Sequence, residues 1–400
     1  MRITVNPSML AALRPAAQPR VVAEPAENGL GGLLPSRRET AALPAPRPRV
    51  VLVAPGPGVP GGQESQATAL ERGLRQEGYP VLRLRIDPIF PPALAWVRRH
   101  RYARTILNQA LYLSSLPCLR RHDVAHVFSA SYWSFLLSAA PALLAGRMLG
   151  KRVILHYHSG EADDHLAHWG LLVHPWLALP HAIVVPSDYL RDVFARHGYL
   201  PRVIPNVVDL SRFRYRERTP LGPRFLCART LDPYYRVDLT LRAFAVLKQR
   251  FPDATLSITG GGTEEGRLRR LTASLGLGGV RFLGPVDPMW MPAVYDGADI
   301  FLNASVLDNQ PVSVLEAFAS GLPVVSTGCG DLAALVRHGK TGLVVPSEDP
   351  AAMAEAATSL LEDPEAAVRM ARRARQVAEE HAWPHVREAW TRVYTGRRKP

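Results

Sequence analysis

Residues 49–77 read RVVLVAPGPGVPGGQESQATALERGLRQE, and this stretch decides the fold class. The run Val50-Val51-Leu52-Val53-Ala54 is apolar at every position, which predicts a strand buried on both faces. A loop of glycine and proline follows, and Gln63 to Glu77 has the length and pattern of a helix. Strand, glycine loop and helix in this order are typical of a parallel sheet covered by helices.

The same alternation continues along the chain. Further apolar runs of strand length lie at Val81–Ile86, Val124–Phe128, Val153–Tyr157, Ile183–Val185, Arg224–Ala228, Thr255–Thr259, Val280–Leu283, Ile300–Leu302, Pro323–Ser326 and Gly342–Val345. Helix-length segments separate them. We therefore predict an α/β fold of two Rossmann-like domains, with parallel sheets that face each other across a cleft.

Chain length and composition suggest the domain boundaries. Four hundred residues exceed what one hydrophobic core usually supports. Residues 1–48 are rich in proline and alanine without periodicity, which predicts a flexible tail. We expect an N-terminal domain at 49–210, a C-terminal domain at 211–381 and a closing helix at 382–400. The segment from Pro205 to Asp209 is predicted to connect the domains.

The net charge of the chain favours an anionic ligand, and its motifs argue against an RNA-binding or zinc-binding protein. The net charge of +13 suggests attraction to phosphates, a membrane surface or nucleic acid. No RNA-binding signature or zinc spacing is present, so a phosphate-bearing substrate is preferred over nucleic acid. Three scattered cysteines fit a reducing cytoplasm and provide no metal cluster. Without a signal-peptide core or an apolar run of about 20 residues, we expect a cytoplasmic protein, soluble or peripheral at the inner membrane face.

Two glycine-rich turns follow predicted strands. Gly61 and Gly62 stand between the first strand and its helix, and Gly260-Gly261-Gly262 follows the strand Thr255–Thr259. Glycine lets a backbone approach a phosphate or sugar closely, and a helix N-terminus favours negative charge. The alternative is a tight turn with nothing bound, because the Gly61 loop matches neither a P-loop nor a dinucleotide fingerprint.

Two arginines are candidates for a diphosphate clamp. Arg229 stands directly after a predicted strand, and Arg236 follows seven residues later. A guanidinium offers a rigid fork of donors that matches phosphate oxygens. A solvated arginine pair is the alternative for both residues.

The segment DNQPVSVLEAF, residues 308–318, is the most informative part of the chain. Pro311 suits a first helical position, so the turn can offer free amides to a phosphate or sugar oxygen. We assign binding of the donor diphosphate to this turn, formed by Asn309, Gln310, Pro311 and Val312. Asp308 and Glu316 could hydrogen-bond hydroxyls, one on the sugar and one on the ribose. An N-cap aspartate and an exposed glutamate are the alternative, although the apolar neighbours of Glu316 argue against a solvated role.

A histidine ends one of the predicted strands. His158 follows the run Val153–Tyr157, where its side chain would reach into the cleft and hydrogen-bond a sugar hydroxyl or a phosphate. His156 lies two residues earlier on the same strand face and is interpreted as a packed histidine.

From residue 49 to 396 the chain resembles glycosyltransferase family 4, which has the GT-B fold. The likeness rests on Asp308 to Gly330, on the segment from His338 to Val345, on the Pro205–Asp209 connection and on the loop at residues 61–64. It implies a metal-independent, retaining hexosyltransferase that uses a UDP- or GDP-linked sugar as co-substrate and no other cofactor. It also implies an N-terminal acceptor domain, a C-terminal donor domain and a closing helix that crosses back to the first domain.

The resemblance also implies roles for individual residues. His158 matches the catalytic histidine of the cleft, Arg229 the first phosphate clamp and Glu316 the ribose-binding acid, and Asp308 stands where the family usually has a glutamate. A lysine is usual near Arg236, where the loop looks one residue longer, so either Tyr235 or Arg236 fills that place. A common glutamate is replaced by Ala334.

The resulting hypothesis is transfer of a sugar to an acceptor hydroxyl on a glycan, a lipid-linked sugar or a small molecule. Positioning and electrostatic stabilisation of the leaving diphosphate would supply most of the rate. The alternatives are a non-catalytic partner that binds a nucleotide sugar, and a nucleotide-sugar epimerase. Residues 96–104 alternate basic with aromatic and apolar side chains, which fits an anionic membrane surface or a solvated helix face.

Overall fold

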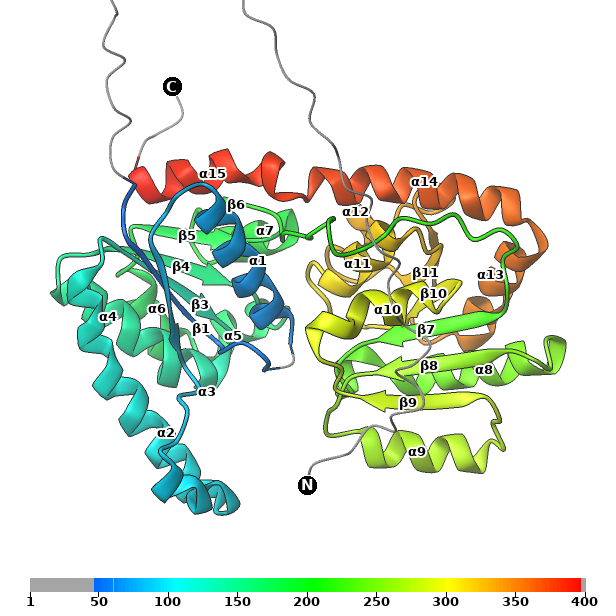
Figure 1. Cartoon of the computed structure of the whole chain (residues 1–400), viewed down its shortest axis with the longest axis horizontal. Coiled ribbons are helices and arrows are strands. Elements are labelled where there is room, and N and C mark those ends of the chain that lie inside the picture. The colour runs from blue at the N-terminus through cyan, green and yellow to red at the C-terminus, as the bar shows by residue number, and fades with distance from the viewer. Residues whose placement is uncertain (1–46, 60, 397–400) are drawn as a thin grey trace, which may run out of the picture. The chain divides into compact units, whose positions relative to one another are not determined.

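Two parallel β-sheets form the core of residues 47–59 and 61–396, the part of the chain that the computed structural model describes (Figure 1). The predicted flexible tail lies outside these residues except for Arg47 and Pro48. Every run predicted as a strand forms one, with ends that differ by at most a residue. The predicted α/β class is therefore confirmed.

The first sheet has the strand order β2-β1-β3-β4-β5-β6. Its strands are β1 (Val50–Ala54), β2 (Val81–Arg85), β3 (Val124–Ser129), β4 (Arg152–Tyr157), β5 (Ala182–Val185) and β6 (Arg202–Val203). The central strand β1 pairs in parallel with β2 and β3, with Val50 opposite Val81 on one side and Val124 on the other. Every residue of β1 is buried because helices cover both faces.

The second sheet has the order β12-β11-β10-β7-β8-β9, again all parallel. Its strands are β7 (Arg224–Ala228), β8 (Thr255–Thr259), β9 (Val280–Gly284), β10 (Ile300–Asn303), β11 (Val324–Thr327) and β12 (Leu343–Val345). The loops that leave the carboxyl ends of neighbouring strands therefore gather at one edge of each sheet.

Helices follow most strands. Those of the first domain are α1 (Gly62–Gln76), η2 (Pro92–Arg99), α2 (Arg101–Ser115), η3 (Leu116–Arg121), α3 (Tyr132–Ser134), η4 (Phe135–Ala139), α4 (Ala140–Met148), α5 (Ala162–His168), α6 (Gly170–Leu177) and α7 (Asp188–Arg196). Those after β7 are η5 (Pro233–Tyr235), α8 (Val237–Arg250), α9 (Glu265–Ser274), η6 (Pro288–Trp290), α10 (Met291–Asp296), α11 (Val312–Ser320), α12 (Leu332–Leu335), α13 (Pro350–Glu362), α14 (Pro364–Glu380) and α15 (Trp383–Thr395). Within the described ranges, no helix combines the length and apolar character that crossing a bilayer requires.

The closing helices α14 and α15 follow each other and join the two sheets (Figure 1). Helix α14 packs its apolar face against α11 in the second domain. Helix α15 instead packs Trp390 and Tyr394 against the core of the first sheet. The approach to helix α1 is close, because a Cβ on Gly73 would lie 2.2 Å from the Trp383 ring. Glycine at this position therefore lets the two helices meet.

The segment that follows β6 is hydrogen-bonded to helix α1 and to the junction of α14 and α15. The side chain of Gln66, in α1, donates to the Val207 carbonyl at 2.9 Å and accepts from the Val207 amide at 2.7 Å. The Val208 amide donates to the His381 carbonyl at the junction of α14 and α15. The two segments that pass between the domains, the one after β6 and the α14–α15 junction, are therefore in contact.

Candidate active site

A cavity of about 730 Å³ lies between the carboxyl ends of the two sheets. Its lining comes from the loops that follow β1, β3, β4 and β6 of the first sheet and β7, β8, β9 and β10 of the second. The predicted site residues that line it are Gly61, Gly62, His158, Arg229, Asp308, Asn309, Gln310, Pro311, Val312 and Glu316. Segments far apart in the sequence therefore meet in one cavity, as the strand-end rule for α/β sheets leads one to expect.

Arg229 leaves the end of β7 and lies almost buried beside the start of α11. Its guanidinium donates to the Ser313 hydroxyl at 3.0 Å and pairs with the Asp308 carboxylate. The Tyr235 ring lies 4.2 Å from its Cζ atom. Burial works against the charge, but the anionic partners outweigh it and raise the pKa of Arg229. Its buried Nε has no hydrogen-bond partner in the described part of the chain, so a donor remains for a ligand.

Helix α11 begins at Val312, one residue later than predicted, because Pro311 keeps an extended ψ of 119°. The amides of Val314 and Leu315 donate to the Pro311 carbonyl. The first amides of a helix have no partner within it, which leaves those of Val312 and Ser313 at the cavity edge. A cationic side chain and a helix N-terminus therefore lie side by side, an arrangement that favours anions.

Glu316 lies on the first turns of α11, half-buried and facing the cavity. The Tyr295 hydroxyl donates to its Oε2 at 2.9 Å. Burial raises the pKa of Glu316 to about 7, although the Tyr295 hydrogen bond opposes the shift. The carboxyl can therefore accept hydrogen bonds from hydroxyls, with an ionisation state that changes near neutral pH.

His158 follows β4 and lines the opposite wall of the cavity. Its ring stacks on Phe128 with 9° between the planes, and the His156 ring lies 4.0 Å away between centroids. Burial lowers the pKa of His158 to about 3, so the imidazole is neutral. Within the described residues its Nε2 is buried without a partner, so the nitrogen is free to bond a ligand.

The glycine turn before α1 also lines the cavity. Gly61 has φ of 150°, a conformation that residues with a side chain rarely adopt, and it precedes the helix directly. No atom lies within 4 Å of a Cβ placed on Gly61 or Gly62. The space above this turn therefore belongs to the cavity rather than to packed protein.

Asn309 and Gln310 use their side chains to tie the two domains together. The Ser187 hydroxyl, at the start of α7, donates to Asn309 Oδ1. The backbone amide of Asn206, in the interdomain connection, donates to Gln310 Oε1 at 2.6 Å, and Gln310 Nε2 donates to Asp331. The Asn309 amide is capped by Asp308 at 3.0 Å. These contacts hold in place the loop that carries Asp308, the ion-pair partner of Arg229.

Arg236 is not among the described residues that line the cavity. It adopts a left-handed conformation with φ of 43° and forms ion pairs with Asp238 and Glu348. Tyr235 lines the cavity instead, beneath the Arg229 guanidinium. Of the two residues predicted as alternatives for the second clamp position, Tyr235 is thus the one near Arg229.

Three supporting features escaped the sequence analysis. Tyr295 contacts Glu316 from helix α10, and no sequence pattern links the two residues. Gly330 has φ of 54°, and a Cβ there would lie 1.9 Å from the Asp308 carbonyl. The sequence signal that could have identified Gly330 is its position in a glycine turn after a predicted strand.

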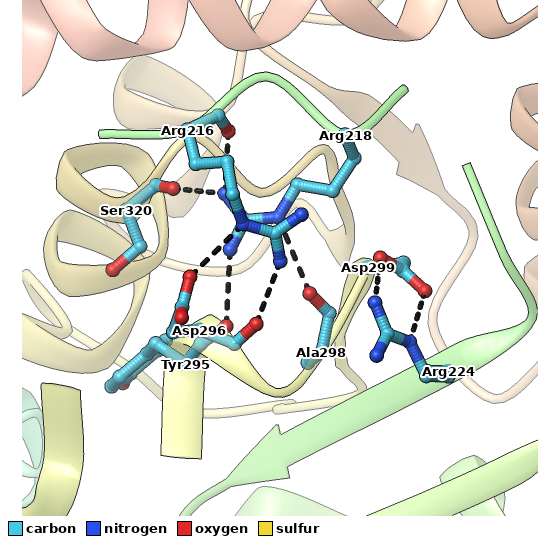
Figure 2. Close-up of polar contacts among 8 residues, drawn as sticks. All are labelled: Arg216, Arg218, Arg224, Tyr295, Asp296, Ala298, Asp299 and Ser320. Atoms are coloured by element: carbon cyan, nitrogen blue, oxygen red, sulfur yellow. Dashed lines mark hydrogen bonds and ion pairs between the residues drawn. The ribbon is translucent and has the colours of Figure 1, made fainter. Parts of the chain in front are cut away.

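The third feature is a buried arginine that holds α10 and α11 together. Figure 2 shows the Arg218 guanidinium donating to the carbonyls of Arg216, Tyr295, Ala298 and Ser320. Arg218 is 1% exposed, and burial lowers its pKa to about 10. Since unpaired carbonyls at a helix end carry negative charge, one cation satisfies the ends of both helices that carry Tyr295 and Glu316.

Within the residues that the structure describes, no group of three or more His, Cys, Asp or Glu side chains could hold a metal ion. Among the described residues that line the cavity, Arg229 is the one arginine or lysine.

Comparison with known proteins agrees with this arrangement. Residues 60–212 match the family model Glycosyltransferase Family 4, and residues 222–363 match Glycosyl transferases group 1. The D-inositol 3-phosphate glycosyltransferase of Corynebacterium urealyticum is 35% identical over 162 residues, which span 38% of each chain. The GDP-mannose-dependent alpha-(1-6)-phosphatidylinositol monomannoside mannosyltransferase of Mycolicibacterium smegmatis is 31% identical over 281 residues, 62% of this chain and 70% of that protein.

A solved structure shows the same fold. The Anabaena protein Alr3699/HepE in complex with UDP and glucose superposes with a TM-score of 0.68 at 18% identity, and the match covers 88% of this chain and 100% of that one. The predicted fold of two Rossmann-like domains is thereby confirmed.

Proposed function

The chain belongs to glycosyltransferase family 4, and from this premise we propose that it moves a sugar from a nucleotide diphosphate to an acceptor hydroxyl. The observation that carries the proposal is the meeting of Arg229 with the amino end of α11 in the cavity. A guanidinium and free helix amides together form a site for a diphosphate. The donor is UDP- or GDP-linked, since one relative is named for GDP-mannose and one solved structure contains UDP.

The surrounding residues suit the rest of such a donor. Glu316 accepts hydrogen bonds from the ribose hydroxyls, and Asp308 faces the sugar. The His158 Nε2, buried and without a partner in the described chain, bonds the transferred sugar from the opposite wall. The catalytic contribution of Arg229 is the stabilisation of charge on the leaving diphosphate, which increases as the glycosidic bond breaks.

We further propose that transfer retains the anomeric configuration and requires no metal ion. Arg229 and the α11 amides supply the positive charge that the leaving diphosphate needs. Measurement of the product anomer by NMR tests the first point. Equal rates with magnesium and with a chelator test the second.

The experiment is to replace Arg229 and Glu316 separately by glutamine and to measure nucleotide release and sugar transfer. Arg229→Gln should lower kcat/KM by about a hundredfold or more, because one transition-state contact typically contributes that much. Arg369→Gln is the matched control, since that side chain is 57% exposed on α14. Unchanged rates in both site variants would remove the proposal.

Two other outcomes would point to the alternatives. Tight donor binding without turnover across a panel of acceptors would indicate a non-catalytic partner protein. Release of an epimerised sugar in the absence of any acceptor would indicate an epimerase. A thermal-shift screen against nucleotide sugars should come first, because it selects the donor for every later assay.

We also propose that the first domain docks on an anionic membrane, where it would meet a lipid-linked acceptor. Figure 1 shows α2 projecting away from the strands of the first sheet. Around its start Trp96, Tyr102 and Ile106 are 59%, 79% and 71% exposed. Residues 88–122 contain six arginines and neither aspartate nor glutamate. Exposed aromatic groups in a stretch that carries arginines and no acidic residues fit the interface of an anionic bilayer.

A further inference from the structure

A column of polar side chains crosses the core of the first domain beneath α15. His126 on β3 and His156 on β4 point to the same face of the sheet, and His158 continues that face beyond the end of β4. His126 is fully buried, and His156 is 3% exposed. The rest of this face packs through apolar side chains. Burying a polar imidazole here costs free energy that an apolar side chain would not.

The members of the column are in direct contact. The Tyr394 hydroxyl of α15 lies 2.8 Å from His126 Nδ1, and His126 Nε2 lies 3.1 Å from His156 Nδ1. The His156 ring lies 4.0 Å from that of His158 between centroids. An unbroken path of side chains therefore runs from the closing helix to the cavity.

The protonation of the column follows from burial. Burial lowers the pKa of His126 to about 3 and that of His156 well below its usual value, so each ring carries one N–H. Burial also raises the pKa of Tyr394 well above its ordinary value, so the hydroxyl keeps its proton. In the described residues its hydrogen-bond partner is His126 Nδ1.

The hydrogen bonds of the column couple the tautomers of its rings and allow two orders of donors. In the first order the hydroxyl is the first donor. Tyr394 donates to His126 Nδ1, which places the His126 proton on Nε2. His126 then donates to His156 Nδ1, which places the His156 proton on Nε2. In the reverse order the buried Tyr394 hydroxyl proton has no acceptor, whereas in the first order the buried His156 Nε2–H has none among the described residues. In either order a change at Tyr394 alters the hydrogen bonding of both rings.

We propose that Tyr394, His126 and His156 are positioning residues: their hydrogen bonds hold the His156 ring in place, and that ring packs against His158 and orients it in the active site. Phe128 and His156, which also contact each other, both pack against that ring. Because α15 continues from α14, which packs on α11, the column also links His158 to the helix pair that joins the domains. The inference rests on the proposed sugar transfer for its kinetic consequence.

The test compares Tyr394→Phe with Tyr79→Phe. Tyr79 is a matched control, because it is also buried against α15 and its hydroxyl bonds Thr391 of that helix at 3.2 Å, outside the column. Tyr394→Phe should lower kcat about fivefold with little change in donor KM, as expected for a small misplacement of a group that acts in the transition state. Tyr79→Phe should leave kcat within about twofold of wild type.

A spectroscopic readout separates this inference from the proposed activity. Two-bond 1H–15N spectra of histidine-labelled protein report the tautomer of each ring. In Tyr394→Phe, the tautomer populations of His126 and His156 should change from those of the wild type, and the His158 signals should shift. Unchanged histidine signals, or an equal kcat loss in both tyrosine variants, would contradict the proposal that these residues position His158. Absence of transfer by the wild type, with the predicted spectra, would instead contradict the proposed function.

Discussion

Glu316 shows how the environment of one carboxyl makes binding and stability depend on pH. Burial raises its pKa to about 7 in the folded protein, whereas an unfolded chain has about 4.5. The folded state therefore holds the proton more tightly, and the stability contributed by this group is full below pH 4.5 and lost as pH rises to 7. We expect Glu316→Gln to remove this loss, which is up to about 3 kcal/mol. Urea unfolding of both proteins at pH 5 and pH 8 measures it.

The same residue should give donor binding the opposite trend. The ionised carboxyl accepts hydrogen bonds from two hydroxyls better than the protonated one, so the affinity for the nucleotide should rise between pH 6 and pH 8. Glu316→Gln should bind more weakly at pH 8 and show a flatter profile. If the stability of the wild type does not fall relative to that of Glu316→Gln between pH 5 and pH 8, the raised pKa of Glu316 is contradicted.

At the residue scale, the sequence identified groups by their positions at strand ends. Arg229 and His158 are predicted because each follows an apolar run, and Glu316 because apolar residues surround it in the helix after Pro311; the structure places all three in one cavity. Tyr295 was not predicted, because its role depends on the packing of α10 against α11. Arg236 was a candidate on spacing, yet local carboxylates at Asp238 and Glu348 pair with it.

At the scale of elements, Arg218 should be a stability residue rather than a site residue. Its guanidinium donates to the Tyr295 and Ala298 carbonyls at the end of α10, to the Ser320 carbonyl at the end of α11 and to the nearby Arg216 carbonyl (Figure 2). Replacement by methionine fills similar volume but removes all four guanidinium hydrogen bonds from this buried site, so we expect a loss of about 3 kcal/mol in the free energy of unfolding. Chemical denaturation measures the loss.

The control for Arg218 is a neighbouring arginine whose charge is exposed. Arg372 pairs with Glu217 on the surface, where its side chain is 62% exposed, so Arg372→Met should change stability far less. Equal losses in the two variants would show that the buried carbonyls do not matter. The donor KM should also rise in Arg218→Met, because α10 carries Tyr295, the partner of Glu316.

Elements were predicted where periodicity alone determines them. A buried strand such as β1 is a continuous apolar run, so its bounds match the prediction. Strand β6 was missed because two residues provide no pattern. Helix α2 was not delimited, because its exposed apolar residues blur the difference between an inner and an outer face.

At the scale of the whole described molecule, the cavity depends on contacts that no local pattern encodes. Ser187 meets Asn309, and Asn206 meets Gln310, across more than a hundred residues of sequence. The sequence predicted that strand ends of both sheets would form a cleft, because parallel sheets require it. The amide side chains that tie its two walls together could be assigned only from the structure.

The exposed surface of α2 gives the final prediction, which concerns where the molecule works. Flotation should recover the protein with vesicles that contain phosphatidylglycerol and not with vesicles of phosphatidylcholine alone, and added salt should weaken the binding. Replacing Arg99 and Arg104 by glutamine should weaken it roughly thirtyfold, at about 1 kcal/mol for each arginine. Trp96→Ser should also reduce it, whereas Leu200→Ser, at a residue 92% exposed elsewhere in the same domain, should not. Equal recovery on neutral and anionic vesicles would show that the charged face does not meet a membrane.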